Sequence, residues 1–213
     1  MIRVVSEKRS SARLRRREQL IEATIAAIAN RGLSRVTISD VAEIADVSHG
    51  LLIFHFESKD RLLAETLRFM SEAHRRMWED ALRQAPPSPA TRLDALIRAE
   101  FNAENQSPER LAAWCAFWGE APNRPLYLEQ CGSNDRAQIE AFEAACADLA
   151  AEGGYAMDAR RAARVIRLTI EGVWLELMFS AKPYSSDEAI KTVYLAAASL
   201  FPRHFSEAGL ISR

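Results

Sequence analysis

One short segment of the chain carries side chains that can contact DNA, at positions where two short helices would present them. Residues 35–63 predict two short helices joined by a tight turn and followed by the start of a longer helix. Thr37 is placed to cap the first helix and Ser48 to cap the second, which covers about residues 48–56. A short helix that is fixed by a small apolar core and has an open N-terminal end can enter the major groove of DNA. The segment therefore predicts a DNA-reading helix-turn-helix.

The candidate DNA contacts divide by where they lie on the two short helices. Groups at a helix start suit phosphates, and side chains near the start of the second helix reach base edges. A neutral His49 can donate and accept a hydrogen bond, so it can read a base. Alternatives stay open: capping alone for Ser48, packing for Gly50, a half-buried position for His55, and a solvated Lys59. The predicted contacts are Thr37, Ser39, Ser48, His49, Gly50, Leu51, His55 and Lys59.

The composition and periodicity of the chain indicate an all-α fold of about nine helices. Of 213 residues, 48% are hydrophobic and 27% charged, and glycine and proline number only eight each. Apolar residues recur at three- and four-residue steps, and no long run of alternating β-branched residues appears. Besides the two short helices, the expected helices cover 14–30, 58–84, 89–105, 107–120, 125–151, 158–181 and 186–204.

The charge distribution suggests how the chain is organised. The net charge is −1, yet residues 1–20 carry seven Lys and Arg against two Glu. Beside a helix-turn-helix, such a segment favours a phosphate-contacting arm over a merely solvated one. We expect a basic, disordered arm over 1–13, a helix-turn-helix DNA-binding domain over 14–60, and a further helical domain over 61–213.

Several classes of function find no support in the sequence. The three cysteines are odd in number and lack C-x-x-C spacing, so neither a disulfide framework nor a zinc site is expected. No glycine-rich phosphate loop, nucleophile motif or metal spacing indicates an enzyme, and no cofactor is expected. The N-terminus lacks the apolar core of a signal peptide, and no apolar run reaches the ~18 residues of a membrane span. A cytoplasmic protein without membrane contact is the expectation.

The N-terminal pattern resembles the tetracycline-repressor (TetR) family of one-component bacterial transcription factors over about residues 16–65. Two positions depart from the family pattern: Asp46 stands where glycine is usual, and Ile53 where an aromatic residue is usual. The resemblance implies a dimer that binds a palindromic operator and responds to a small molecule, and it makes 61–213 a helical ligand-binding and dimerisation domain. The matching residues are Gly32, Thr37-Ile38-Ser39-Asp40-Val41-Ala42, Ala45, Val47-Ser48-His49-Gly50, His55-Phe56, Ser58-Lys59-Asp60 and Leu62-Leu63.

The C-terminal half is similar to the branch of that family that contains the choline-responsive repressor of glycine-betaine synthesis. The similarity rests on W-C-A-F-W-G-E-A-P-N-R-P at 114–125 and I-E-G-V-W-L-E-L at 170–177. Aromatic faces near a carboxylate attract a quaternary ammonium group by about 0.5–2 kcal/mol per ring. Packing in the core is the alternative for tryptophans four residues apart. The candidate effector residues are Phe101, Trp114, Phe117, Trp118, Glu120, Glu171 and Trp174.

Two small-residue stripes near the C-terminus suit dimerisation through a four-helix bundle, with packing inside one chain as the alternative. The leading hypothesis is a dimeric repressor that a small molecule releases from its operator. The alternative is a DNA-binding protein without such an effector, controlled by a protein partner or acting architecturally. The stripes are Ala162, Val165, Ile166, Thr169, Gly172 and Val173, and Ile190, Val193, Tyr194, Ala197, Ala198 and Phe201.

Overall fold

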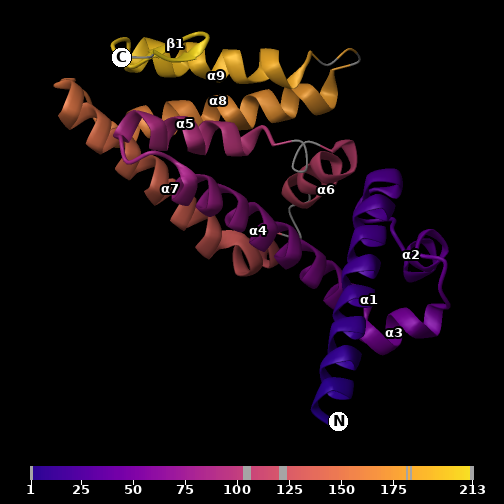
Figure 1. Cartoon of the computed structure of the whole chain (residues 1–213). Coiled ribbons are helices and arrows are strands. Elements are labelled where there is room, and N and C mark those ends of the chain that lie inside the picture. The colour runs from indigo at the N-terminus through magenta and orange to yellow at the C-terminus, as the bar shows by residue number, and fades with distance from the viewer. Residues whose placement is uncertain (1, 103–106, 120–123, 181, 183, 212–213) are drawn as a thin grey trace. The chain divides into compact units, whose positions relative to one another are not determined.

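The prediction of an all-α protein is confirmed. The structure is a computed structural model that describes residues 2–102, 107–119, 124–180, 182 and 184–211 (Figure 1). In those ranges it contains nine helices and one short hairpin. The elements are α1 (Ile2–Arg31), α2 (Ile38–Ile44), α3 (His49–Phe56), α4 (Lys59–Gln84), α5 (Pro89–Glu100), α6 (Pro108–Gly119), α7 (Arg124–Gly153), α8 (Ala159–Phe179), α9 (Ser186–Leu200), β1 (Phe205–Ser206) and β2 (Gly209–Leu210).

The chain forms two compact units whose boundaries differ from the predicted ones. The first unit comprises Met1–Ser71 and Pro108–Cys131, and the second comprises Glu72–Ser107 and Gly132–Arg213. Helices α4 and α7 contribute residues to both units. The helix-turn-helix therefore shares its unit with α6, a segment that the sequence assigns to the other domain.

The first unit is held together by a core in which α1, α2, α3 and α4 meet α6. Figure 1 shows α2 and α3 beside α1. The apolar face of α1 supplies Leu20 and Ile28, and the recognition-type helix α3 supplies Leu52 and Phe56. Burial of side chains this size stabilises the fold by about 1.5–3 kcal/mol each. The core also includes Val41, Leu62, Leu67, Ala113, Trp114, Phe117 and Cys131.

Helix α1 is longer than the sequence predicts. It runs from Ile2 to Arg31, whereas the sequence predicts a helix that starts at about residue 14, after the arm over 1–13. The physical reason is that no glycine or proline interrupts this stretch, and Arg, Lys and Glu are good helix formers. At the other end, Gly32 has a φ of 79° and its N–H donates to the Ile28 carbonyl at 2.8 Å, as the sequence predicts for a left-handed cap.

The turn between α2 and α3 explains why glycine is usual at position 46. Asp46 has a φ of 51°, in the left-handed region that glycine adopts most easily. Asp tolerates this region better than most side chains do. After this residue, the Val47 N–H donates to the Ala42 carbonyl at 3.0 Å, which closes the turn.

The second unit packs α5, α8 and α9 together and ends in a hairpin that the sequence does not predict. Helix α9 stops at Leu200, and β1 pairs antiparallel with β2 in a register that joins Phe205 to Leu210. The Phe205 ring stacks on Tyr194 of α9, with ring centroids 6.2 Å apart. The Tyr194 hydroxyl donates to an oxygen of Asp94 on α5 at 2.5 Å. The hairpin therefore packs against α9 and α5.

Candidate nucleic-acid interface

Both short helices of the first unit are capped as the sequence predicts. Thr37 caps α2: its hydroxyl oxygen accepts from the Asp40 N–H at 3.2 Å. The Asp40 carboxylate accepts in return from the Thr37 N–H and hydroxyl, at 2.8 and 2.7 Å. These hydrogen bonds from Thr37 hold the pKa of Asp40 below its ordinary value. A phosphate contact from the Thr37 hydroxyl would therefore have to replace its bond to Asp40.

The N-terminal ends of α2 and α3 lie close together. Ser48 caps α3, and its hydroxyl oxygen accepts from the Leu51 N–H at 3.3 Å. Ser39 near the start of α2 lies 3.5 Å from Nδ1 of His49, the first residue of α3, and both side chains are exposed. The structure thus brings Ser39, Ser48 and His49 to one surface. A nucleic acid held there meets two hydroxyls and an imidazole.

The later part of α3 presents mainly carbon to solvent. Gly50 is exposed and Leu51 is half-buried. Ile53 and Phe54 are exposed to 38% and 70%, although sequence reasoning did not name them as DNA contacts. The signal that could have found Phe54 is its place opposite the buried positions of an eight-residue helix, with Ile53 at the edge of that side.

His55 is held against α1 and is less available than its sequence position suggests. Its ring is half-buried between Phe54 and Phe56, and burial followed by the charges of Arg13, Arg17 and Arg16 lowers its pKa. His55 is therefore neutral near pH 7 in the absence of DNA, and any phosphate contact it makes uses a neutral ring.

Arg17 connects α1 to α3 and α4. Its guanidinium donates to the His55 carbonyl at 2.7 Å, lies 4.4 Å from the centre of the Phe56 ring, and pairs with Glu65 of α4. By contrast, Arg13 and Arg16 are exposed on α1. Of the basic residues near the N-terminus, Arg17 thus has a structural role, whereas Arg13 and Arg16 face solvent where phosphates can approach.

Lys59 opens α4 in the same unit. Its Nζ lies 3.4 Å from the Ser34 carbonyl, and its side chain is half-buried. This weak bond is compatible with a phosphate contact because an ammonium group has three donors. The predicted DNA contacts from Thr37 to Lys59 all lie in the first unit.

The predicted effector residues divide between the two units. In the first unit, Trp114 and Phe117 are 6% and 1% exposed and belong to the core, whereas Trp118 is 39% exposed. The rings of Trp114 and Trp118 lie 6.0 Å apart, and Tyr127 meets Trp114 edge-on at 6.5 Å. Glu120 lies outside the described residues. The core alternative therefore holds for Trp114 and Phe117, and Trp118 remains the exposed aromatic of this group.

In the second unit, a buried polar cluster lies beside Trp174. His74 Nε2 lies 3.1 and 3.2 Å from the two carboxylate oxygens of Glu100, and Gln138 donates to Glu100 at 2.6 Å. The rings of His74 and Trp174 meet edge-on with centroids 6.1 Å apart. Sequence reasoning missed this cluster, although His74 and Glu100 fall on otherwise apolar helix faces, which is a readable signal.

Two further carboxylates, Glu171 and Asp135, lie near Glu100 of this cluster. Burial raises the pKa of Glu171, Arg167 opposes the rise, and the nearby Asp135 and Glu100 add to it. The partly buried negative charge suits a cation. Phe101, also predicted from the sequence, is 9% exposed in the same unit.

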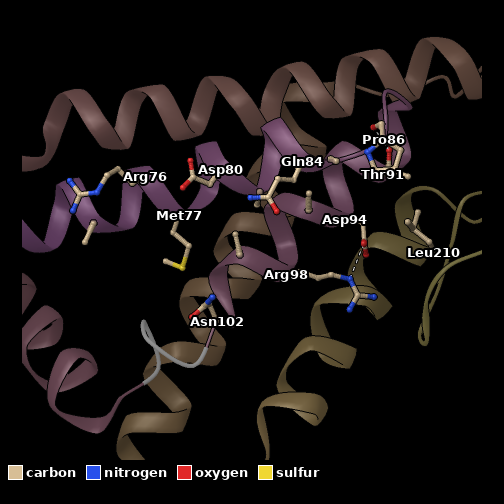
Figure 2. Close-up of a pocket in the computed structure, with 15 residues that line it drawn as sticks. Arg76, Met77, Asp80, Gln84, Pro86, Thr91, Asp94, Arg98, Asn102 and Leu210 are labelled. Carbon is tan, nitrogen blue, oxygen red and sulfur yellow. Dashed lines mark hydrogen bonds and ion pairs between the residues drawn. The ribbon is translucent and has the colours of Figure 1, made fainter.

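A groove of about 830 Å³ lies elsewhere in the second unit, between α4, α5 and β2 (Figure 2). Figure 2 shows Arg98 reaching toward Asp94, whose carboxylate accepts from Arg98 Nε at 2.8 Å. The described residues that line the groove include no aromatic side chain. The groove therefore lacks the walls that a quaternary ammonium group needs.

Comparison with known proteins agrees with this architecture over most of the chain. Residues 20–66 match the bacterial regulatory proteins of the tetR family, and residues 89–202 match the C-terminal domain of the BetI-type transcriptional repressor. The HTH-type transcriptional regulator BetI of Paraburkholderia xenovorans (strain LB400) is 33% identical over 180 residues, which are 83% of this chain and 89% of that protein. BetI of Pseudomonas aeruginosa (strain LESB58) is 28% identical, over 84% of this chain and 89% of that protein.

Solved structures share the fold. A transcriptional regulator from Pseudomonas aeruginosa PAO1 is 28% identical with a TM-score of 0.71, covering 88% of this chain and 91% of that chain. A regulator from Saccharomonospora viridis, solved in complex with choline, is 20% identical with a TM-score of 0.72, covering 83% of this chain and 92% of that one.

The helix-turn-helix and the family matches define a transcriptional regulator and not an enzyme. The chain belongs to the TetR family and carries a BetI-type C-terminal domain. Among the helices that the structure describes, none has the length and apolar run that a bilayer crossing requires.

Proposed function

We propose that the protein is a dimeric repressor that binds a palindromic operator through α3 and is released from it by a small cationic effector. The observation that carries the DNA-binding part is the surface formed by Ser39, Ser48 and His49, with exposed Arg13 and Arg16 on α1 of the same unit. Hydroxyls and an imidazole can meet base edges and phosphates, and exposed guanidinium groups neutralise backbone charge. The other predicted contacts, Thr37, Gly50, Leu51, His55 and Lys59, lie in the same unit.

Dimerisation is supported by an apolar stripe on α8 that the second unit leaves exposed. Val165, Leu168, Leu175 and Phe179 recur at three-, four- and seven-residue steps and are 40–76% exposed. Gly172 continues the stripe and lets two helices approach closely. Uncovered apolar stripes of this length mark protein interfaces. The stripe predicted from the sequence is only partly exposed. Val165 is exposed, whereas Ala162, Ile166 and Val173 are buried inside the unit.

A matched pair of substitutions tests the dimer. Leu168→Glu places a charge in the proposed interface, where the side chain is 55% exposed in one chain. Leu128→Glu changes an equally exposed leucine, at 59%, that lies on α7 outside the stripe. Analytical ultracentrifugation should show a monomer for Leu168→Glu and an unchanged dimer for Leu128→Glu. Dimers of both variants would reject the α8 interface.

A quaternary ammonium effector is supported by the chemistry of the second unit. Glu171 and Trp174 lie on α8, and Glu100 and Asp135 add negative charge near Glu171. The carboxylates and the aromatic ring are the groups that hold such a cation. In the first unit, Trp118 is a separate candidate, because its exposed aromatic side chain can contact a cation by itself. The choline complex of the Saccharomonospora viridis regulator makes choline the first probe.

The proposed switch runs through helices that the two units share. Helix α4 begins at Lys59 in the first unit and ends in the second, so a shift of α4 moves part of the DNA-binding unit. A ligand changes DNA affinity only as far as it binds the two states with different affinity.

DNA binding and release can be measured together. Fragments upstream of the gene and its neighbours are footprinted with the full chain, and choline is then titrated against the bound fragment. Choline should release the protein, whereas 3,3-dimethyl-1-butanol, its uncharged isostere, should not. Equal effects of both compounds would reject cation recognition. A footprint that choline leaves intact would support the alternative without this effector, which the burial of Trp114 and Phe117 also favours.

A further inference from the structure

Helix α3 lacks the side chains that usually read bases by paired hydrogen bonds. Its sequence, His49–Phe56, contains no Arg, Lys, Asn, Gln, Asp or Glu. These are the residues that bind guanine or adenine in a bidentate way or accept from cytosine. His55 turns toward α1. Hydrogen-bonded readout by α3 is therefore limited to its first turn, at Ser48 and His49.

Beyond the first turn, α3 offers apolar side chains to its surroundings. Phe54 is 70% exposed and its neighbour Ile53 is 38% exposed, while Leu52 and Phe56 are buried in the core. Helical spacing places Phe54 on the side opposite those buried residues and Ile53 at the edge of that side. Two adjacent large apolar side chains on the uncovered side of so short a helix form a contact surface.

Gly50 lies one turn before Phe54 on the same side of α3. A Cβ added there would meet only the Ser48 hydroxyl oxygen, at 4.0 Å, and the backbone is not in the left-handed region. Neither packing within the chain nor backbone conformation therefore requires glycine, and alanine would favour the helix. A missing side chain at this place fits the close approach of another molecule. The uncovered side of α3 thus has a recess at Gly50 and a projecting ring at Phe54.

The occupant that fits this surface is the thymine methyl group. The C5 methyl of thymine is the apolar feature of the major groove, and apolar side chains contact it there. Exposed Arg13 and Arg16 and the half-buried Lys59 supply positive charge for phosphates in the same unit. We propose that Phe54, together with Ile53, sets operator specificity by contacting thymine methyl groups. The proposal rests on the proposed DNA-binding function of α3.

Uracil substitution tests this proposal directly. The full chain is used to select duplexes from a random-sequence library, and the strongest duplex is remade with deoxyuridine in place of each thymidine in turn. Uracil pairs as thymine does and lacks only the methyl group. At one or two thymidines in each half-site, this loss should weaken binding about fourfold per methyl. At those positions Phe54→Ala should bind the thymine and uracil duplexes equally.

The controls separate this contact from general effects. Ile44→Ala removes another exposed apolar side chain, on α2, and should keep the full uracil penalty. Equal binding of all uracil duplexes by the natural chain would overturn the proposal, as would penalties that persist in both Phe54→Ala and Ile53→Ala. Phe54→Ala could instead change the oligomeric state of the DNA-free protein and leave the uracil penalty intact. That result would overturn the proposal and place Phe54 in a contact between two copies of the chain. A library that yields no preferred duplex would reject the proposed function itself.

Discussion

Arg110 on α6 and Glu22 on α1 form an ion pair, with 2.7 Å between Arg110 Nη2 and Glu22 Oε1. The two residues are 88 positions apart in the sequence, and the Arg110 side chain is only 12% exposed. Together with the burial of Trp114 and Phe117, this pair fixes α6 within the unit that contains α3. In the proposed switch, a ligand that contacts α6 acts on the same compact body that reads DNA.

The two tryptophans of α6 should respond differently to truncation. Trp114→Ala opens a cavity in the core of the first unit, so it should lower the free energy of unfolding by about 3–5 kcal/mol and weaken operator binding. Trp118→Ala removes a 39% exposed ring, so it should change stability little while reducing the choline response. Urea unfolding and DNA titration check both variants. Equal destabilisation by the two would contradict the assignment of Trp114 to the core and Trp118 to the surface.

His74 should make the stability of the second unit depend on pH. Burial alone would lower the pKa of His74, but the charge and hydrogen bond of Glu100, with Asp135, outweigh it and raise the pKa above the ordinary 6.5. The resulting stabilisation is fully present below pH 6.5 and is lost as the pH rises through the folded-state pKa. Gln138 and Trp174 also face the ring and do not titrate in this range.

The variant His74→Gln isolates the pH-dependent stabilisation by His74, because the natural chain and the variant share the other titrating groups, such as His55. The natural chain should have a higher free energy of unfolding than His74→Gln, and this difference should be larger at about pH 5.5 than at about pH 9. Urea titrations at the two pH values give this difference. An excess that grows with pH would contradict the direction given for the His74 pKa.

Asp46→Gly should stabilise the turn of the helix-turn-helix. Position 46 has a φ of 51°, where glycine avoids the strain of a side chain, so we expect a gain of about 0.5–1 kcal/mol. Asp60→Gly, the same substitution in the first turn of α4, should instead cost about 0.5–1 kcal/mol. Thermal unfolding of the two variants measures both effects. Destabilisation of similar size in both would show that the backbone at position 46 is not strained.

Local signals account for the parts of the fold that the sequence predicts well. The Thr37 and Ser48 caps lie at the predicted helix starts, and Gly32 ends α1, because capping depends on residues within one turn. The effect of Asp46, which stands where glycine is usual, can be predicted for the same reason, since the left-handed conformation involves only that residue.

Long-range packing sets the limit of prediction from the sequence. The pairing of Arg110 with Glu22 joins segments that no local pattern connects, so the place of α6 in the first unit was not foreseen. The His74 and Glu100 cluster likewise depends on which helix faces meet. The β1–β2 hairpin has strands of two residues, too short to show an alternating pattern.

Substitution of Gly50 tests most directly whether the uncovered side of α3 reads DNA. Gly50→Leu adds a side chain where the chain itself leaves room, so the fold should be at least as stable as before. In the operator complex the same side chain should clash, costing about 1–3 kcal/mol, which is about 5- to 150-fold in affinity. Gly132→Ala, at a helical glycine of α7 with nothing near its Cβ, should leave DNA binding unchanged. Fluorescence anisotropy on the selected duplex should therefore show lost affinity at an unchanged or higher melting temperature for Gly50→Leu, and operator affinity equal to that of the natural chain would contradict the account.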